Sequence, residues 1–208
     1  MGAAQPMTDR PAIDRRRLLY LTTAAVGAFG VAAAAWPFID QMNPDAGMRA
    51  SGDVVDVNLD ELRLGQRRVV HWHHVPISVV HRTPAMLAAM QDKAFVARLV
   101  DPQSEHRQQP PYAMNWHRST DPAYAVLVGV CTWCGVIPQY LAEASPPDVV
   151  GGYFCPSCAS HYDPAGRAHA GVARYNLAVP PFAIERSRLV IGKNTGGEIF
   201  TLESVERI

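Results

Sequence analysis

The chain has 208 residues, enough for one domain with a hydrophobic core, and 48% of them are hydrophobic. Its 19 basic and 19 acidic residues cancel at pH 7. This balance, without a basic stripe interleaved with aromatic residues, argues against a nucleic-acid-binding protein. The 17 prolines, with β-branched runs between them, favour short strands joined by turns.

An apolar span near the N-terminus predicts a single transmembrane helix. Residues 18–39 contain no charged side chain. As a helix they would measure about 33 Å, which matches a hydrocarbon core of about 30 Å. Arg15, Arg16 and Arg17 lie directly before the span and Asp40 lies directly after it. The positive-inside rule therefore predicts a cytoplasmic tail (residues 1–17) and export of everything beyond the span.

The arginine run also resembles a twin-arginine signal, which directs the export of folded proteins. The competing interpretation is a cleaved secretory signal, with a cleavage site among the alanines at 32–35. We favour an uncleaved anchor because the span is long and continues through Trp36, Pro37 and Phe38.

The exported part is predicted to be a hinge (residues 40–52) followed by one antiparallel β domain (residues 53–208). A short helix is expected over 85–99 and a proline-rich surface loop over 101–122. The expected strands cover residues 54–59, 68–74, 75–82, 124–130, 175–179, 189–192 and 198–202. His71 and His73 are expected on one face of a strand and His74 on the other. Without a third convergent ligand, we interpret them as solvated residues.

The four cysteines form two C-x-x-C pairs, Cys131 with Cys134 and Cys155 with Cys158. Each pair is a tight turn that directs two sulfur atoms to one point. Two such turns can surround a Zn or Fe ion as a tetrathiolate, and this spacing is a strong signal for a metal site. The alternative from spacing alone is a pair of disulfides in an oxidising compartment.

Beyond the cysteines, the order of motifs resembles that of the Rieske iron–sulfur subunits of quinol–cytochrome c oxidoreductases. The similarity runs from about Asp14 to the C-terminus. The matching segments are residues 15–17, 36–37, 41–44, 82–83, 101–103, 129–132, 152–156, 160–163 and 166–167.

The resemblance implies an all-β fold: a Rieske-type antiparallel domain whose cluster-binding subdomain covers about residues 129–175, on one transmembrane helix. It implies a translocase subunit in which a [2Fe–2S] cluster passes electrons from ubiquinol to a c-type cytochrome. The implied partners are cytochrome b with its ubiquinol pocket, the c-type cytochrome and membrane lipid, within a dimeric complex. The implied location is the bacterial inner membrane, with the globular domain in the periplasm.

The family pattern uses two cysteines and two histidines as ligands, with two further cysteines in a disulfide. Here Cys131 and Cys155 match the cysteine ligands, whereas Trp133 and Cys158 occupy the histidine positions. Val136 and Ser157 stand where the disulfide cysteines belong, and Cys134 is an additional thiol.

We therefore predict that Cys131, Cys134, Cys155 and Cys158 bind the metal or cofactor. The resemblance adds Ser160 and Tyr162 as hydroxyls that hydrogen-bond to sulfur. The centre is a [2Fe–2S] cluster by resemblance, with a mononuclear Fe or Zn tetrathiolate as the alternative. The alternative function is a non-redox structural paralogue whose site binds Zn or is empty.

Overall fold

The computed structural model describes residues 14–41, 54–142, 151–195 and 199–207. The chain divides into two compact units, Met1–Gly47 and Met48–Ile208, and each is treated by itself. Most of the predicted tail (residues 1–17) and of the predicted hinge (residues 40–52) lies outside the described residues.

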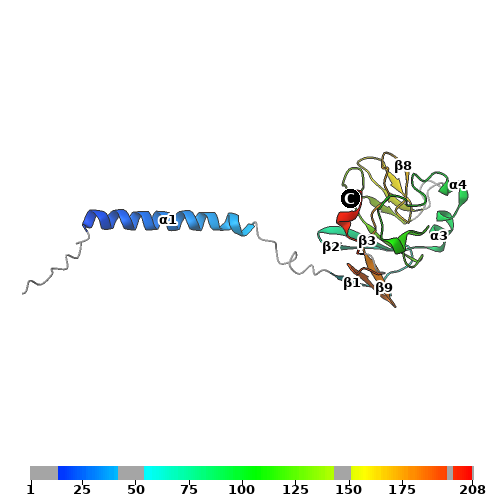
Figure 1. Cartoon of the computed structure of the whole chain (residues 1–208), viewed down its shortest axis with the longest axis horizontal. Helices are drawn as coiled ribbons and strands as arrows, with labels where there is room; N and C mark the ends of the chain where they lie inside the picture. The colour runs from blue at the N-terminus through cyan, green and yellow to red at the C-terminus, as the bar shows by residue number, and fades with distance from the viewer. Residues whose placement is uncertain (1–13, 42–53, 143–150, 196–198, 208) are drawn as a thin grey trace, which may run out of the picture. The chain divides into compact units, whose positions relative to one another are not determined.

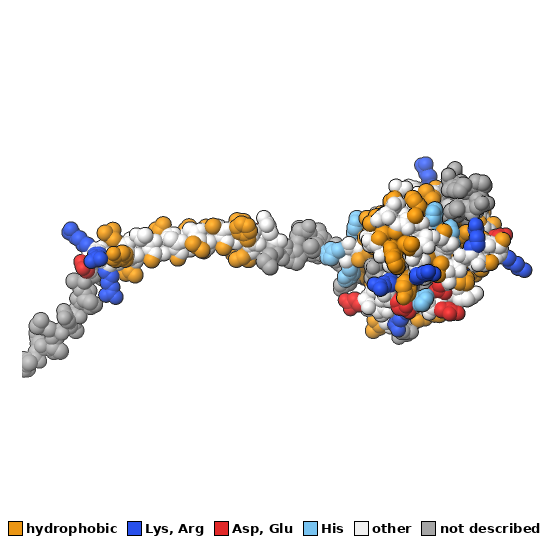
Figure 2. All heavy atoms as spheres, turned by 90° about the horizontal axis from the view of Figure 1, so that it is seen from above, with side chains coloured by type: hydrophobic (Ala, Val, Ile, Leu, Met, Phe, Trp, Pro, Cys, Tyr) orange, Lys and Arg blue, Asp and Glu red, His pale blue; other side chains and the backbone are white. Residues whose placement is uncertain are grey.

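The first unit contains one long apolar helix, α1 (Arg15–Gln41), which includes the whole predicted span (Figure 1). Its 27 residues make it about 40 Å long. None of its residues is buried, and apolar side chains cover its visible face (Figure 2). It is therefore long and apolar enough to cross a bilayer.

The described residues of the second unit form three antiparallel sheets, with strand orders β1-β10-β9, β2-β3-β4 and β5-β6-β7-β8. This confirms the predicted all-β class. The described strands are β1 (Val55–Asn58), β2 (Arg67–Trp72), β3 (Val75–His81), β4 (Tyr124–Val128), β5 (Gln139–Leu141), β6 (Gly152–Phe154), β7 (His161–Tyr162), β8 (Ala168–Ala170), β9 (Phe182–Glu185) and β10 (Arg188–Ile191). The described helices of this unit are α3 (Pro84–Met90), α4 (Lys93–Val96) and the short 3₁₀ turns η1 (Pro111–Ala113) and η2 (Leu202–Ser204).

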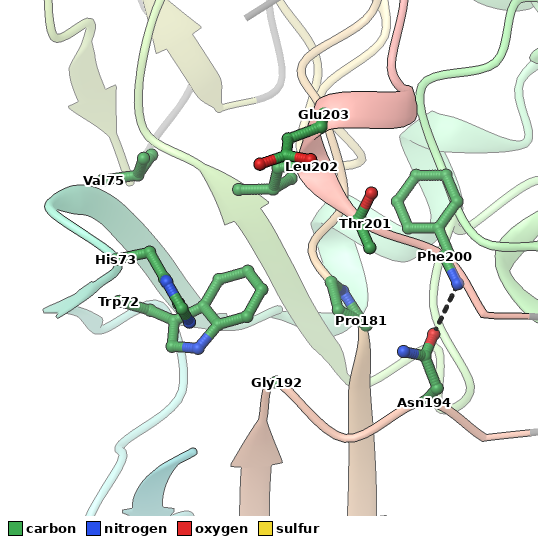
Figure 3. A pocket seen from close by; sticks show the side chains of 10 residues that line it. All are labelled: Trp72, His73, Val75, Pro181, Gly192, Asn194, Phe200, Thr201, Leu202 and Glu203. Atoms are coloured by element: carbon green, nitrogen blue, oxygen red, sulfur yellow. Dashed lines mark hydrogen bonds between the residues drawn. The ribbon is translucent and has the colours of Figure 1, made fainter. Parts of the chain in front are cut away.

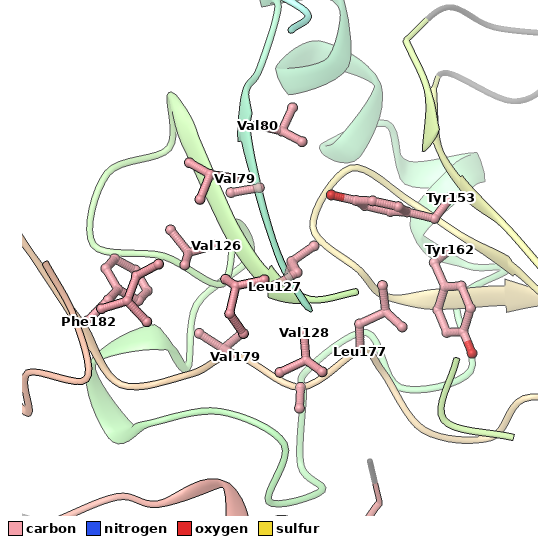
Figure 4. Close-up of a cluster of buried hydrophobic side chains, with 14 of the residues drawn as sticks. Val79, Val80, Val126, Leu127, Val128, Tyr153, Tyr162, Leu177, Val179 and Phe182 are labelled. Atoms are coloured by element: carbon pink, nitrogen blue, oxygen red, sulfur yellow. The ribbon is translucent and has the colours of Figure 1, made fainter. Parts of the chain in front are cut away.

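The hydrophobic core forms around β3 and β4, whose central residues are buried irrespective of which face they occupy (Figure 4). Ile77, Val79 and Leu127 are completely buried. Cys131 and Cys155 belong to the same cluster of buried residues. The cysteine turns are thus anchored in the core at their first residue.

The close pairing of β6 with β7 depends on one glycine. Gly152 has φ +109°, and a Cβ atom there would lie 2.1 Å from the carbonyl oxygen of Tyr162. Only glycine permits this backbone approach. It holds β6 and β7 together, and the second cysteine turn connects them.

The helix predicted over 85–99 is wrong in its continuity, because it is split into α3 and α4. The Asp92 carboxylate accepts a hydrogen bond from the Phe95 amide at 2.9 Å and so caps a new helix. Aspartate competes in this way with the helical backbone for amide donors, and it therefore favours helix starts over helix interiors.

The prediction of a loop over 101–122 is confirmed, since η1 is its only helical turn, but its placement at the surface is wrong for the buried part of the segment. Gln108, Arg118 and Ser119 have essentially no exposed surface. Most of their polar atoms hydrogen-bond inside the protein; for example, the Arg118 guanidinium donates to Gln109 Oε1 at 2.7 Å, although its Nε has no partner. A proline-rich polar segment can therefore be internal when its polar side chains hydrogen-bond to one another and to backbone.

Two predicted strands are absent from the described residues. Residues 175–179 form no regular element, because their backbone hydrogen bonds go to three different segments, at Gly166, Val128 and Gln108, so no ladder forms. Of the predicted strand 198–202, only residues 199–202 are described, and none is in a strand.

The prediction that His71, His73 and His74 all lie on one strand is also wrong. His71 lies on β2, but His73 and His74 form the β2–β3 turn with φ of 45° and 66°. All three are exposed, as expected of solvated residues.

Candidate metal centre

The first cysteine turn follows β4 directly. The Cys131 amide donates to the Val136 carbonyl at 2.9 Å, and the Gly135 amide donates to the Cys131 carbonyl at 2.9 Å. Gly135 has φ +72°, a conformation that glycine adopts without strain. The turn thereby folds Cys134 back toward Cys131.

The second cysteine turn, between β6 and β7, repeats this backbone arrangement. The Cys155 amide donates to the Ser160 carbonyl at 2.8 Å, which is again a bond to the fifth residue along the chain. Ala159, the residue after the second cysteine, again has a positive φ, of 52°. The two turns, residues 131–136 and 155–160, are called the cysteine knuckles below.

The knuckles face each other, so that all four Sγ atoms lie within 4.8 Å of one another. Across the two knuckles, Cys131 Sγ is 3.5 Å from Cys158 Sγ, and Cys134 Sγ is 3.3 Å from Cys155 Sγ. All four cysteines are free thiols. A disulfide would need sulfur atoms about 2.0 Å apart. The arrangement is instead that of a set of convergent metal ligands.

The site is buried on one side and open on the other. Cys131 and Cys155 are buried, whereas Cys134 and Cys158 are partly exposed. Burial, together with the hydrogen bond to the Cys134 thiol, raises the pKa of the Cys155 thiol to about 12. Without a cation, then, the sulfur cluster strongly disfavours the thiolate form at Cys155.

Two hydroxyl groups contact the sulfur atoms. The Tyr162 hydroxyl lies 3.2 Å from Cys131 Sγ, and Ser160 Oγ lies 3.2 Å from Cys158 Sγ. Ser160 Oγ also accepts the Ala173 amide at 3.1 Å, which fixes its position. Once the sulfurs are thiolates, they can only accept, and the hydroxyls become the donors.

Sequence reasoning missed Thr132, which holds Tyr162 in place. Its hydroxyl donates to the Tyr175 carbonyl at 2.8 Å and lies 3.1 Å from the Tyr162 hydroxyl. Since Tyr175 is distant in sequence, no local pattern signals this link. Burial and the Cys131 thiol both raise the pKa of Tyr162, so the hydroxyl keeps its proton and stays a donor.

Comparison with known proteins adds the family. Residues 7–45 match the family model described as "Ubiquitinol-cytochrome C reductase Fe-S subunit TAT signal". The chain is 40% identical over 188 residues to the ubiquinol-cytochrome c reductase iron-sulfur subunit of Allochromatium vinosum, covering 88% of this chain and 90% of that protein. The subunit of Blastochloris viridis is 39% identical, with coverage of 89% and 96%.

The chain belongs to the family of ubiquinol-cytochrome c reductase iron-sulfur subunits.

A third iron-sulfur subunit, from Rhodospirillum rubrum, is 41% identical, with coverage of 86% and 91%. Among solved structures, a chain of "Hyperthermophilic respiratory Complex III" matches with a TM-score of 0.44 and 19% identity. That match covers 82% of this chain and 98% of the other.

Within this family, the chain does not offer the donor set of a histidine-ligated Rieske cluster. Trp133, which the resemblance places at the first histidine position, is 61% exposed, and its indole has no lone pair with which to bind a metal. Cys158 presents sulfur at the second position. The residues present therefore fit an all-thiolate centre and do not fit a two-histidine one.

The nearest histidine in sequence, His161, packs elsewhere. Its ring lies 4.8 Å from that of Phe154 and 5.7 Å from that of His169, centroid to centroid. It is absent from the group of convergent ligand atoms found among the described residues.

A hollow of about 480 Å³ lies elsewhere on the head, between the β2–β3 turn and the C-terminal segment (Figure 3). Its described lining is mostly apolar and includes Trp72, Val75, Pro181 and Phe200, with His73 and Glu203 also present. None of its described lining residues is a cysteine.

Proposed function

We propose that this chain is the electron-carrying subunit of a membrane-bound respiratory ubiquinol–cytochrome c reductase, and that its four cysteines hold the iron. The observation that carries the proposal is the convergence of four Sγ atoms within 4.8 Å in a member of this family. Four thiolates fit iron, and when bound the iron supplies a site for one electron.

The length of α1 and the arginines at its start support the proposed anchor and its orientation. Its apolar length suits one membrane crossing, and the arginines at its start favour a cytoplasmic N-terminus. The match of residues 7–45 to a family model with a twin-arginine signal supports export of a folded head. We therefore place the head in the periplasm of a bacterial inner membrane, on an uncleaved anchor.

The proposed docking surface is the apolar rim around the knuckles. Trp133 is 61% exposed and Ile137 is 55% exposed, while Val172 is also exposed. Large apolar side chains at a protein surface mark interaction sites when they gather beside a functional group. We assign this rim to contact with cytochrome b at its ubiquinol pocket and, alternately, with a c-type cytochrome, within a dimeric complex.

The chain's own residues tune this centre. Tyr162 and Ser160 donate hydrogen bonds to thiolate sulfurs, and such bonds favour the more negative, reduced state. The absence of imidazole ligands lowers the reduction potential. Two-histidine Rieske centres have potentials of about −150 to +300 mV, against about −400 mV for all-cysteine plant-type clusters. Without an imidazole ligand, the rim also has no group in the family position that takes the quinol proton.

The test is a redox titration of the full chain, purified in detergent from cells supplied with iron. We expect visible absorption that bleaches reversibly with one electron per chain. Tyr162→Phe should lower the midpoint potential by about 40 mV, because one hydrogen bond of about 1 kcal/mol to sulfur is lost. A colourless, redox-silent protein with zinc at the cysteines would contradict the proposal and support a structural role.

A further inference from the structure

We infer that the four cysteines enclose a single metal ion, with no bridging sulfide, as a closed tetrathiolate. For the identity of that metal as iron, the inference rests on the proposed function. Its geometric part concerns the number of ions and stands on the sulfur positions alone.

The distances between sulfur atoms decide between one ion and two. In a tetrahedral site with bonds of about 2.3 Å, every pair of thiolate sulfurs is separated by about 3.8 Å. In a two-iron cluster, sulfurs bound to different irons are separated by about 5 Å or more, because the iron–iron distance adds to the outward reach of both bonds. Here no pair exceeds 4.8 Å.

The contacts between the knuckles sharpen this point. A two-iron cluster of the plant type keeps two sulfurs on each iron, so two sets of sulfurs must stand apart. Here the close pairs, at 3.5 Å for Cys131 with Cys158 and 3.3 Å for Cys134 with Cys155, do not stand apart, because no sulfur of one pair is more than 4.8 Å from a sulfur of the other. The four atoms form one compact group, and a single ion satisfies all of them with small adjustments.

The equivalence of the two knuckles supports the same conclusion. In both, the amide of the first cysteine donates a hydrogen bond to the carbonyl of the fifth residue along the chain. Both also have a positive φ at the residue directly after the second cysteine, Gly135 or Ala159. Two equivalent turns related in this way present two sulfurs each to a common centre, as tetrahedral coordination requires. Such a closed site leaves no position for substrate or water.

Native mass spectrometry of the full chain in detergent, with acid-labile sulfide analysis, tests the inference after expression with iron and zinc both supplied. We expect one metal ion per chain and no labile sulfide. Cys134→Ser should lose the metal. Ser157→Ala, an exposed substitution in the second knuckle, should retain it. Trp133→Phe should also retain it, since the indole is not a ligand.

The outcomes separate this inference from the proposed function. One iron without sulfide supports both. Two irons with two sulfides would overturn the single-ion inference and leave the electron-carrying function standing. One zinc without sulfide would support the single-ion inference and overturn the function. Two disulfides without metal would overturn both.

Discussion

The head contains two buried polar clusters that differ in how they are completed. The first is formed by the cysteine knuckles, whose four sulfur atoms converge without a basic side chain in the described group. The second is a group of buried arginines, Arg82, Arg118 and Arg167, around the carboxylate of Asp163. The sulfur cluster needs a cation from outside the chain to stabilise its thiolates. The arginine cluster finds most of its hydrogen-bond partners within the chain, with Arg118 Nε as the exception.

The arginine cluster is held by backbone carbonyls and one acid. Arg82 donates to the carbonyls of Pro164, Pro122 and His117 at 2.7–3.1 Å. Arg167 is paired with Asp163 at 2.7 Å. Burial lowers the pKa of Arg82 to about 10, which leaves its charge intact at neutral pH. These bonds tie together the segments that contain Pro122, His117 and Pro164.

The contrast predicts different responses to mutation. Removing a knuckle sulfur should abolish metal binding while the body of the head stays folded. Removing a buried arginine should destabilise the body whether or not metal is present. The predictions below run from the largest effect to the smallest.

Cys134→Ser should weaken metal binding by more than about a hundredfold, because losing a ligand exceeds the 10–100-fold loss typical of losing a residue that merely supports a ligand. Competition with a chelator measures the affinity. The Ser157→Ala chain is the matched control. Equal affinity in the Cys134→Ser chain would show that this thiol is not a ligand.

Arg118→Met should destabilise the head by about 3–5 kcal/mol, because it removes the donors that satisfy buried acceptors. The lost partners include the Ala165 carbonyl at 3.1 Å and Gln109 Oε1 at 2.7 Å. Chemical unfolding of the full chain in detergent measures the change. Arg63→Met, at an exposed position, should change the stability by less than about 0.5 kcal/mol. Similar losses in both variants would remove the distinction between the clusters.

Gly171→Ala should disturb the second knuckle at a cost of about 3 kcal/mol, because a Cβ there would lie 2.5 Å from both the Ala159 carbonyl oxygen and Ser160 Cα. Gly135→Ala in the first knuckle meets no atom within 4 Å and should cost only about 1 kcal/mol, from its positive φ. Unfolding curves of the two variants test the difference. Equal losses of unfolding free energy in the two variants would show that close packing at Gly171 does not support the second knuckle.

Acid should destabilise the head through His169. Burial lowers the pKa of this histidine to about 4 from an ordinary 6.5, so the unfolded chain binds the proton more readily. The stabilisation from its neutral form is therefore present above pH 6.5 and is lost as pH falls from 6.5 to 4. Because the ring is partly exposed, we expect a discounted loss of about 1–2 kcal/mol.

His169→Gln should reduce that loss, measured as the difference between unfolding free energies at pH 7 and pH 4.5. The exposed His71→Gln variant, on β2, is the control and should keep the full acid sensitivity. An unchanged pH dependence in His169→Gln would assign the acid sensitivity to other groups.

The sequence was sufficient for those parts of the molecule that are set by local chemistry. The uncharged span predicted α1, alternation and β-branched runs predicted β1 to β4 and β10, and the C-x-x-C spacing identified the four thiols that the fold brings together. In each case, neighbouring residues determine the outcome.

What could not be predicted depends on distant partners. The short strands β5 to β8 have little local pattern, and their pairing relies on contacts such as the approach of Gly152 to Tyr162. Thr132 acquires its role from Tyr175, far along the chain. From sequence alone, the buried arginines would be predicted at the surface, because the carbonyls that accept their hydrogen bonds are distant in the chain.

The most direct test of the account is X-ray absorption spectroscopy of the full chain, purified with its native metal. We predict an iron edge, a first shell of four sulfur atoms at about 2.3 Å and no second iron nearby. A first shell that contains nitrogen, or a protein without bound metal, would contradict the claim that these four cysteines complete the centre.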